Sequence, residues 1–163
     1  MKVCLTLFLV IFMSAAFPAV HSVAEVNAPQ AGQAVKDESP LFAVLLGGNE
    51  VSDEGDAAVG DPDGRGSATV LINQAQGTIC FGITVSGLST PQAAHIHQNV
   101  AGHNGTIVIG FTAPTTGNPG AVSGCVTGVN PTLLKNIKTN PSMFYVNVHT
   151  TDFPGGAIRG QLY

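Results

Sequence analysis

The sequence has no tryptophan and little charge, since charged residues make up 10% of the chain and the formal net charge is −4. Lys and Arg together number six and form no cluster or stripe. Proteins that bind nucleic acids need clustered positive charge to contact the phosphate backbone. The composition therefore excludes nucleic acid as an expected partner.

Long hydrophobic runs are also scarce. One stands at the N-terminus, where Lys2 precedes an apolar stretch from Val3 to Phe17 and Val20-His21-Ser22 places small residues at the −3 and −1 positions. This pattern predicts a secretory signal peptide, residues 1–22, that is cleaved near Ser22. The alternative is a membrane anchor, but the run is shorter than the span of about 20 apolar residues that a bilayer requires. We therefore expect a secreted or extracellular protein, periplasmic in a Gram-negative bacterium, with no membrane span after cleavage.

Cysteine is rare as well, with three residues in the chain. Signal cleavage removes Cys4 and leaves Cys80 and Cys125, and two cysteines in an exported domain predict one disulfide. Alternation along the predicted strands puts both side chains on the polar face, so the two sulfurs can meet. The alternative is a pair of free thiols, and the spacing does not match a zinc motif.

Residues 23–40 show no hydrophobic periodicity and are predicted to be a flexible lead-in. After them, short β-rich runs alternate with Gly, Pro, Asn and Asp, without a βαβ rhythm or an internal repeat. Pro131 to Ile137 has helical spacing, which predicts a short helix or turn near 131–139. The pattern predicts an all-β antiparallel sandwich in one domain, residues 41–163. The expected strands are Leu41–Leu46, Gly66–Ile72, Thr78–Ser86, Ala93–Gln98, Thr106–Phe111, Ala121–Thr127, Phe144–Thr150 and Ala157–Leu162.

Two histidine-containing segments hold the residues best suited to chemistry. Alternation along a strand puts His95 and His97 on one face and Ile96 on the other. In the second segment it puts Asn147 and His149 on a shared face. If the two strands are neighbours, three imidazoles converge and can bind Cu(II) or Zn(II). The alternative is that these histidines hydrogen-bond to the backbone and to Asn147 and organise the loops.

Other polar residues are expected around the three histidines. His103 lies in a Gly-rich segment, and Arg159 lies on the outward face of the last predicted strand. We group Asn147, Arg159 and His103 as a polar cluster beside the metal ligands. A charged Arg159 there would disfavour a cation and favour an anion or a partner's carboxylate. An ion pair between Asp152 and Arg159 across the intervening turn is the usual explanation for such a charge.

Most of the acidic residues gather between Glu50 and Asp63. The segment Gly60–Gly66 has carboxylates two residues apart, as calcium loops do, but it lacks the further ligands and the distal Glu. We therefore interpret the acidic residues as solvated by water. Asn104-Gly105-Thr106 is a glycosylation sequon, relevant only in a eukaryotic secretory pathway. No Ser or Cys stands in a nucleophile-elbow context, so we assign no catalytic residue.

At these residues the chain resembles the CHRD domain, a module named from repeats in chordin and also found in single-domain secreted proteins. The Cys80 and Cys125 pair is similar to the single-domain branch. The chain departs from the family pattern after Asn49-Glu50-Val51, where Ser52 and an acidic insertion replace the common proline. The matching segments are Phe42–Val51, Gly60–Gly66, Ala94–His97, Gly102–Gly105, Tyr145–Thr150 and Phe153–Leu162.

The resemblance implies an immunoglobulin-like Greek-key β-sandwich in an extracellular setting, without an established reaction. We therefore expect a secreted binding or structural module rather than an enzyme, with an extracellular ligand or protein as its partner. The competing hypothesis is a copper- or zinc-binding protein, with or without redox activity, that uses His95, His97 and His149. A weaker likeness to copper–zinc superoxide dismutase rests on the His-x-His spacing alone, so we do not expect dismutation.

Overall fold

A computed structural model describes residues 39–163 of the chain. The predicted signal peptide, residues 1–22, and nearly all of the predicted lead-in, residues 23–40, lie outside the described residues. The described elements, in chain order, are β1 (Leu41–Leu46), a 3₁₀ turn (Gly47–Asn49), β2 (Arg65–Asn73), β3 (Thr78–Ser86), β4 (Pro91–Gln98), β5 (Thr106–Phe111), β6 (Gly120–Val126), α1 (Pro131–Thr139), a second 3₁₀ turn (Pro141–Met143), β7 (Phe144–Thr150) and β8 (Ile158–Gln161).

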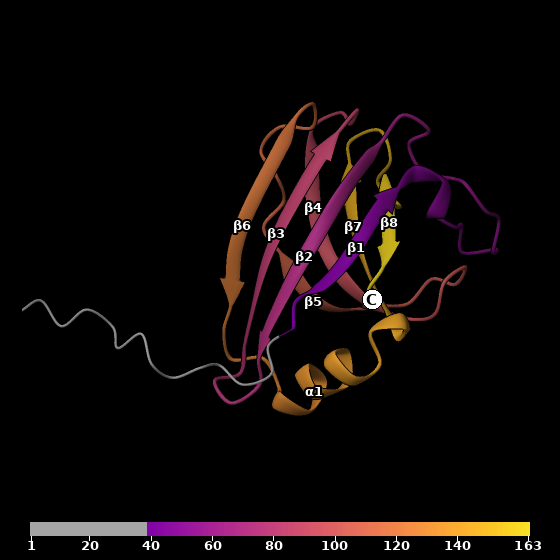
Figure 1. Ribbon diagram of the computed structural model, residues 1–163. Helices are drawn as coiled ribbons and strands as arrows, with labels where there is room; N and C mark the ends of the chain where they lie inside the picture. Colours follow the sequence, from indigo (N-terminus) through magenta and orange to yellow (C-terminus); the bar gives the residue numbers. More distant parts are fainter. Residues whose placement is uncertain (1–38) are drawn as a thin grey trace, which may run out of the picture. The chain divides into compact units, whose positions relative to one another are not determined.

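The eight strands form one antiparallel sheet in the order β5-β4-β7-β8-β1-β2-β3-β6. The sheet curls on itself, so that β4 and β5 lie behind β2 and β3 (Figure 1). The rings of Phe81 in β3 and Phe111 in β5 stack with their centroids 4.1 Å apart, although these strands are distant in the sheet order. The sheet is thus nearly closed into a barrel, and within the described chain its edge strands β5 and β6 are not paired with each other.

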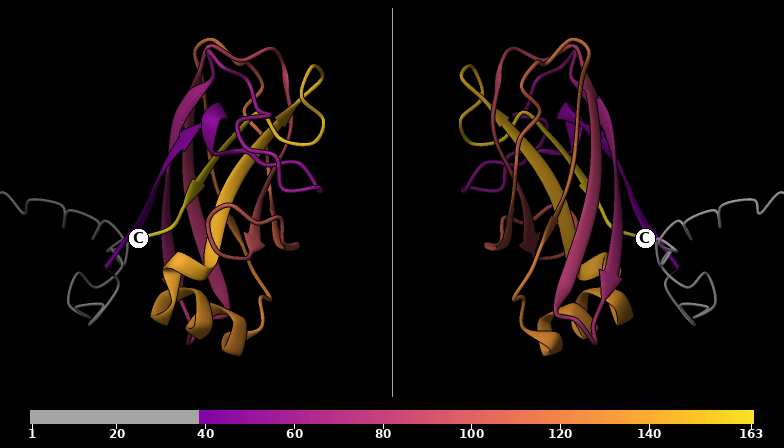
Figure 2. Two further views of the ribbon diagram at one scale, coloured as in Figure 1. Left: turned by 90° about the vertical axis from the view of Figure 1, so that its right-hand side faces the viewer. Right: turned by 90° about the vertical axis from the view of Figure 1, so that its left-hand side faces the viewer.

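The predicted all-β antiparallel class and the short helix are confirmed. Helix α1 begins at Pro131, after Asn130 accepts a hydrogen bond from the backbone N–H of Thr132. Leu134 and Ile137 are the buried residues of α1, and the helix lies at one end of the curled sheet (Figure 2). The finer prediction of an immunoglobulin-like Greek-key sandwich is not confirmed, because hydrogen bonding runs without a break through one sheet.

The core lies inside the curl and is built from alternating aliphatic residues. In β1, for example, Leu41, Ala43 and Leu45 are buried while Phe42 and Val44 are exposed. The same alternation confirms the inward face predicted for the histidine-bearing strands and their neighbour. Its members are at most 1% exposed: Ile96, Val146, Val148, Ile158 and Leu162.

The outer face of β4, β7 and β8 is partly covered by loops, which bury Asn147 and Arg159 and leave His95 and His149 half-buried. Gln161 donates a hydrogen bond to the carbonyl of Asn99, and Asn49 donates one to the carbonyl of Arg159. These contacts hold the segments 99–105 and 47–64 against the sheet. A layer of buried polar side chains therefore lies between the strands and the two loops, and this layer contains the candidate site.

The predicted disulfide between Cys80 and Cys125 is present. The two residues stand directly opposite each other in β3 and β6, and both side chains lie on the outer face, as predicted from the alternation. The bridge fastens the edge strand β6 to the rest of the sheet, away from the histidine-bearing strands.

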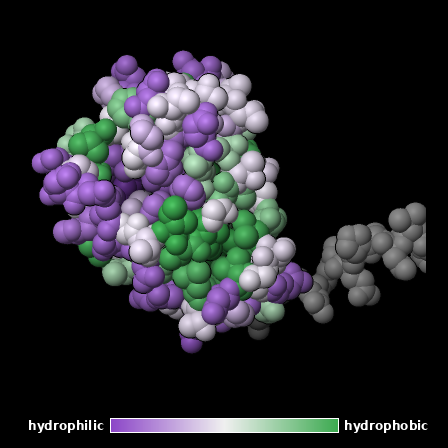
Figure 3. Space-filling view, turned by 180° about the vertical axis from the view of Figure 1, so that it is seen from behind, coloured by the Kyte–Doolittle hydropathy of each residue, from purple (hydrophilic) through white to green (hydrophobic). Residues whose placement is uncertain are grey.

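The rear of the molecule shows a hydrophobic area among polar residues (Figure 3). The edge strand β5 lies on this side and carries Ile107, which is 55% exposed, next to the partly buried Val108. The hydrophobic surface therefore accompanies the open edge of the sheet, whereas polar side chains gather over the covering loops.

Candidate metal site

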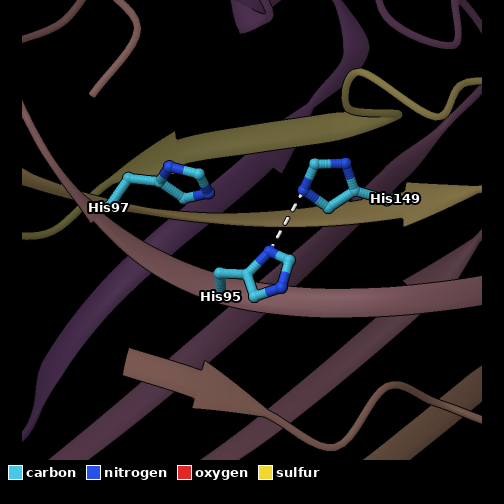
Figure 4. Close-up of side chains that lie close together, drawn as sticks. All are labelled: His95, His97 and His149. Carbon is cyan, nitrogen blue, oxygen red and sulfur yellow. Dashed lines mark hydrogen bonds between the residues drawn. The ribbon is translucent and has the colours of Figure 1, made fainter. Parts of the chain in front are cut away.

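Strands β4 and β7 bring the three predicted histidines onto one face. The strands are hydrogen-bonded neighbours, with His95 opposite Asn147 and His97 opposite Tyr145. Because side chains two residues apart share a face, His149 lies on the same side as Asn147. The three imidazole rings gather around one space above the sheet (Figure 4).

One nitrogen of each ring can reach a common ion. His95, His97 and His149 each offer one ring nitrogen, and these three nitrogens all lie within 4.8 Å of one another. The closest pair is His95 Nδ1 and His149 Nε2, at 3.2 Å. Two nitrogens bound tetrahedrally to one ion at about 2.0–2.1 Å are about 3.4 Å apart. One pair thus already has the spacing of two ligands, and the third ring needs a shift of about 1.4 Å or less.

Backbone carbonyls fix the tautomers of two of the rings. His97 Nδ1 lies 2.8 Å from the carbonyl oxygen of Gly105, and His149 Nδ1 lies 2.9 Å from that of Pro154. A carbonyl oxygen only accepts, so each Nδ1 carries the proton of the neutral ring and each Nε2 keeps a lone pair. The buried Nε2 of His97 has no hydrogen-bond partner. A carbonyl partner at Nδ1, with Nε2 left to bind the ion, is the arrangement of metal-binding histidines; here Nε2 is unpaired in His97 and faces Nδ1 of His95 in His149.

Burial and neighbouring charges lower the pKa values of His95 and His97, which favours their neutral rings. Burial is the main cause that lowers the pKa of His95, and the charged forms of His149 and His97 lower it further. Burial is also the main cause that lowers the pKa of His97, against a raising effect of its bond to Gly105. Neutral imidazole is the form that binds a metal, so the folded protein presents His95 and His97 ready for ligation.

Arg159 lies in the same layer, 1% exposed, and its guanidinium donates to the 99–105 loop. Nη2 donates to the carbonyls of Val100 and His103, and Nη1 donates to Oδ1 of Asn104. Arg159 lies on the outward face of β8, as expected, but it is buried there because the 99–105 loop folds over it. The predicted ion pair with Asp152 is not among its contacts either.

Tyr145 separates Arg159 from the nearest imidazole. The guanidinium carbon of Arg159 lies 3.4 Å from the centre of the Tyr145 ring, and the His97 ring stacks on Tyr145 with centroids 4.8 Å apart. The positive charge of Arg159, which would disfavour a cation nearby, therefore contacts the Tyr145 ring and the carbonyl oxygens of the 99–105 loop. His103, the third member of the predicted polar cluster, has an exposed side chain and contributes only its carbonyl here.

Glu50 is the residue that sequence reasoning missed. The prediction that the acidic residues are solvated by water is wrong for Glu50 and Asp61, which are 2% and 9% exposed. Burial raises the pKa of Glu50 to about 7, although the charge of Arg159 and a hydrogen bond from Asn147 act in the opposite direction. The signal available in the sequence was the position of Glu50 in Asn49-Glu50-Val51, directly after a strand and before the acidic insertion.

Asn104, the sequon residue, joins the two covering loops. Its Nδ2 donates to the carbonyl of Val51 and to Oδ1 of Asp53, and its Oδ1 accepts from Arg159. The nitrogen that a glycan would occupy is thus already used in fastening one loop to the other. Glycosylation at Asn104 stays a prediction tied to a eukaryotic host.

Comparison with known proteins gives one match. The sequence model of one protein family, described as the CHRD domain, matches residues 41–162. Curated proteins show no match, and solved structures show none either. None of the helices in residues 39–163 has the length and apolar character needed to span a bilayer.

Proposed function

The chain belongs to the CHRD domain family, and from this premise we propose that it is a secreted module that binds a transition-metal ion, copper or zinc, through His95, His97 and His149. The observation that carries the proposal is the convergence of three ring nitrogens, two of them on rings whose Nδ1 atoms are held by carbonyls. Imidazole nitrogens suit both metals, and affinity at such a site follows Cu(II) above Zn(II).

Export is the second part of the proposal. A disulfide such as Cys80–Cys125 persists in oxidising compartments and is rare in the cytosol. The predicted signal peptide supports the same location. We also propose that the domain has the immunoglobulin-like Greek-key arrangement that the family resemblance implies. The strand order alone does not establish this arrangement.

The second candidate is a binding or structural module that holds no metal. The hydrogen bond between His95 and His149 favours it, because the rings then satisfy each other. In that case the histidines organise the turn at Pro154 and the 99–105 loop, and an extracellular protein or small ligand binds elsewhere on the domain.

Titration calorimetry separates the two candidates. The protein without its signal peptide is titrated with Cu(II) and with Zn(II) at neutral pH, together with the variants H95A, H97A and H149A. We expect binding of one ion per chain and a strong loss of affinity in each variant. The control is H103A, which removes an exposed imidazole and should bind like the wild type. Absence of binding by the wild type would rule out the metal site and leave the loop-organising role.

A further inference from the structure

Asn147 stands at the centre of the buried polar layer. Its strand neighbours in register are His95 on β4 and Arg159 on β8. It shares a strand face with His149, two residues further along β7, and is itself only 2% exposed. The side chain therefore lies on the same face of the sheet as the three histidines.

The oxygen of this side chain has no hydrogen-bond partner. Asn147 Oδ1 and His97 Nε2 are both buried and both unpaired. The amide nevertheless stays beside two of the rings, because Asn147 stands directly opposite His95 and diagonally from His97 across the β4–β7 pair. An unpaired buried acceptor carries a desolvation cost of about 1–3 kcal/mol unless a ligand satisfies it. Two unpaired acceptors facing one space indicate a ligand that accepts electron pairs, which a metal ion does.

We propose that Oδ1 of Asn147 is the fourth protein ligand of the metal, giving a closed donor set of His95, His97, His149 and Asn147. This inference rests on the proposed function, since it needs the same ion in the same place. Amide oxygens are weaker donors than imidazoles, but they occur beside nitrogen ligands in copper sites. Three nitrogens and one oxygen complete the four positions of a tetrahedral ion.

Glu50 is the positioning residue for this ligand. Its carboxyl group is buried in the same polar layer as the Asn147 amide, each residue being 2% exposed, and Asn147 is one of the groups that act on its pKa. A carboxyl group keeps an accepting oxygen whether or not it is protonated, so the Asn147 NH₂ group can face Glu50 and leave Oδ1 facing the histidines. Gly156 gives the carboxylate its space, because a Cβ atom there would lie 2.4 Å from Glu50 Oε1. The covering loop thus supplies the outer partner that such ligands usually have.

A closed donor set has a functional consequence. Structural metal sites fill all four positions with protein atoms, whereas catalytic sites keep one position for water or substrate. With Asn147 bound, the ion has no directly bound water, and the module holds its metal rather than using it to activate a substrate.

The test compares N147A with N147D in Cu(II) and Zn(II) titrations and in electron paramagnetic resonance of the Cu(II) form. We expect N147A to bind at least about tenfold more weakly, by analogy with the loss of ligand-supporting groups. N147D keeps an oxygen donor at the same place and should restore affinity. In deuterated water, N147A should show a directly bound exchangeable water that is absent in the wild type. The control is N73A, since Asn73 bonds only to Gln76 in the turn after β2.

The role of Glu50 is tested in the same assays with E50A and E50Q. Glutamine keeps an oxygen that accepts from Asn147, so E50Q should retain most of the affinity and the wild-type Cu(II) spectrum, while E50A should lose about tenfold or more. The exposed Glu54 gives the matched control E54A on the same loop.

The outcomes separate this inference from the function on which it rests. If the wild type binds no metal, both fail. If the wild type binds through the three histidines, but N147A keeps the same affinity and spectrum, then the metal site stands and the fourth ligand is wrong. A directly bound water in the wild type would also contradict the closed set.

Discussion

Arg159 and Tyr145 form a cation–aromatic pair, with the guanidinium carbon 3.4 Å from the ring centre. The pair spans neighbouring strands, β8 and β7, while His97 stacks on the same ring from β4 on the other side. A permanent positive charge and a ring that must stay neutral to bind metal are thus joined through one tyrosine. The stack allows a buried arginine to hold the covering loop without occupying the metal-binding space.

This arrangement predicts that Arg159→Lys destabilises the fold although the charge is kept. Lysine cannot reproduce the fork of donors to Val100, His103 and Asn104, nor the planar stacking on Tyr145. We expect the free energy of unfolding in urea to fall by about 2–5 kcal/mol. Arg65→Lys, at an exposed position, should change it by no more than about 0.5 kcal/mol. Equal effects of the two substitutions would contradict the role given to Arg159.

The raised pKa of Glu50 should make the free energy of unfolding depend on pH. Its folded pKa of about 7 lies above the ordinary value of 4.5, so the stability associated with its protonated form is complete below pH 4.5 and is lost as pH rises to about 7. The full loss amounts to about 3 kcal/mol. Relative to the wild type, E50Q should therefore gain stability progressively between pH 4.5 and 7.5, measured without metal by denaturant unfolding. Taking the difference between the two proteins cancels the histidine contributions. A difference that does not vary with pH would show that the pKa of Glu50 is not raised.

Gly156→Ala should be destabilising for two reasons. The residue has φ +142°, which L side chains rarely adopt, and its Cβ would meet the Glu50 carboxylate. We expect a loss of about 1–3 kcal/mol in thermal or urea unfolding. Gly155→Ala is the neighbouring control, because nothing lies within 4 Å of a Cβ there. Adding E50A to G156A should recover the steric part of the loss and leave the backbone part.

Removal of the disulfide should lower stability without affecting the metal site. The bridge joins residues separated by 45 positions, and the chain-entropy model gives about 4 kcal/mol for a loop of this length. C80A/C125A should therefore unfold at lower urea concentration. Its affinity for Cu(II) should match that of the wild type, because β3 and β6 carry none of the proposed ligands. A large loss of affinity would show that the two regions are coupled.

Metal binding itself should weaken in acid. Ligation requires neutral imidazoles, and protons compete with the metal for the same nitrogens. An unperturbed imidazole is half-protonated at about pH 6.5, but the pKa values of His95 and His97 are lowered. Affinity should therefore hold to a lower pH than a free histidine peptide allows and then fall. Calorimetry between pH 5 and pH 7.5 measures this, and a pH-independent affinity would exclude histidine ligation.

The parts of the fold that sequence predicted well are those governed by a repeating period. Alternation placed Ile96 in the core and its histidine neighbours on the opposite face, and the same rule brought Cys80 and Cys125 to one side of the sheet. A shift of one residue along a strand would move all of its side chains to the opposite face of the sheet, so the alternation determines which side chains are buried. The helix followed from a proline start and its apolar spacing.

The features that the sequence did not predict depend on how the loops fold and on how the sheet curls toward a barrel. Glu50 lies outside any strand, so no period indicates whether its side chain points to water or into the layer. Its burial follows from Gly60 and Gly156, far apart in sequence, which leave room around it. The burial of Arg159 likewise needs the 99–105 loop. The near closure of the sheet depends on distant contacts such as Phe81 with Phe111, which the short-range pattern does not encode.

The sheet order has a consequence for how the chain folds. Strand β1 lies between β2 and β8, and Phe42 and Tyr163 exchange both backbone hydrogen bonds, at 3.1 and 3.0 Å. The seam of the sheet thus joins segments about as distant in sequence as the domain allows. Because folding slows as contacts become less local, the hairpins β2–β3 and β4–β5 can assemble early, and the seam must wait for the last strand. We expect refolding in milliseconds to seconds, with β8 the last strand to gain protection from hydrogen exchange.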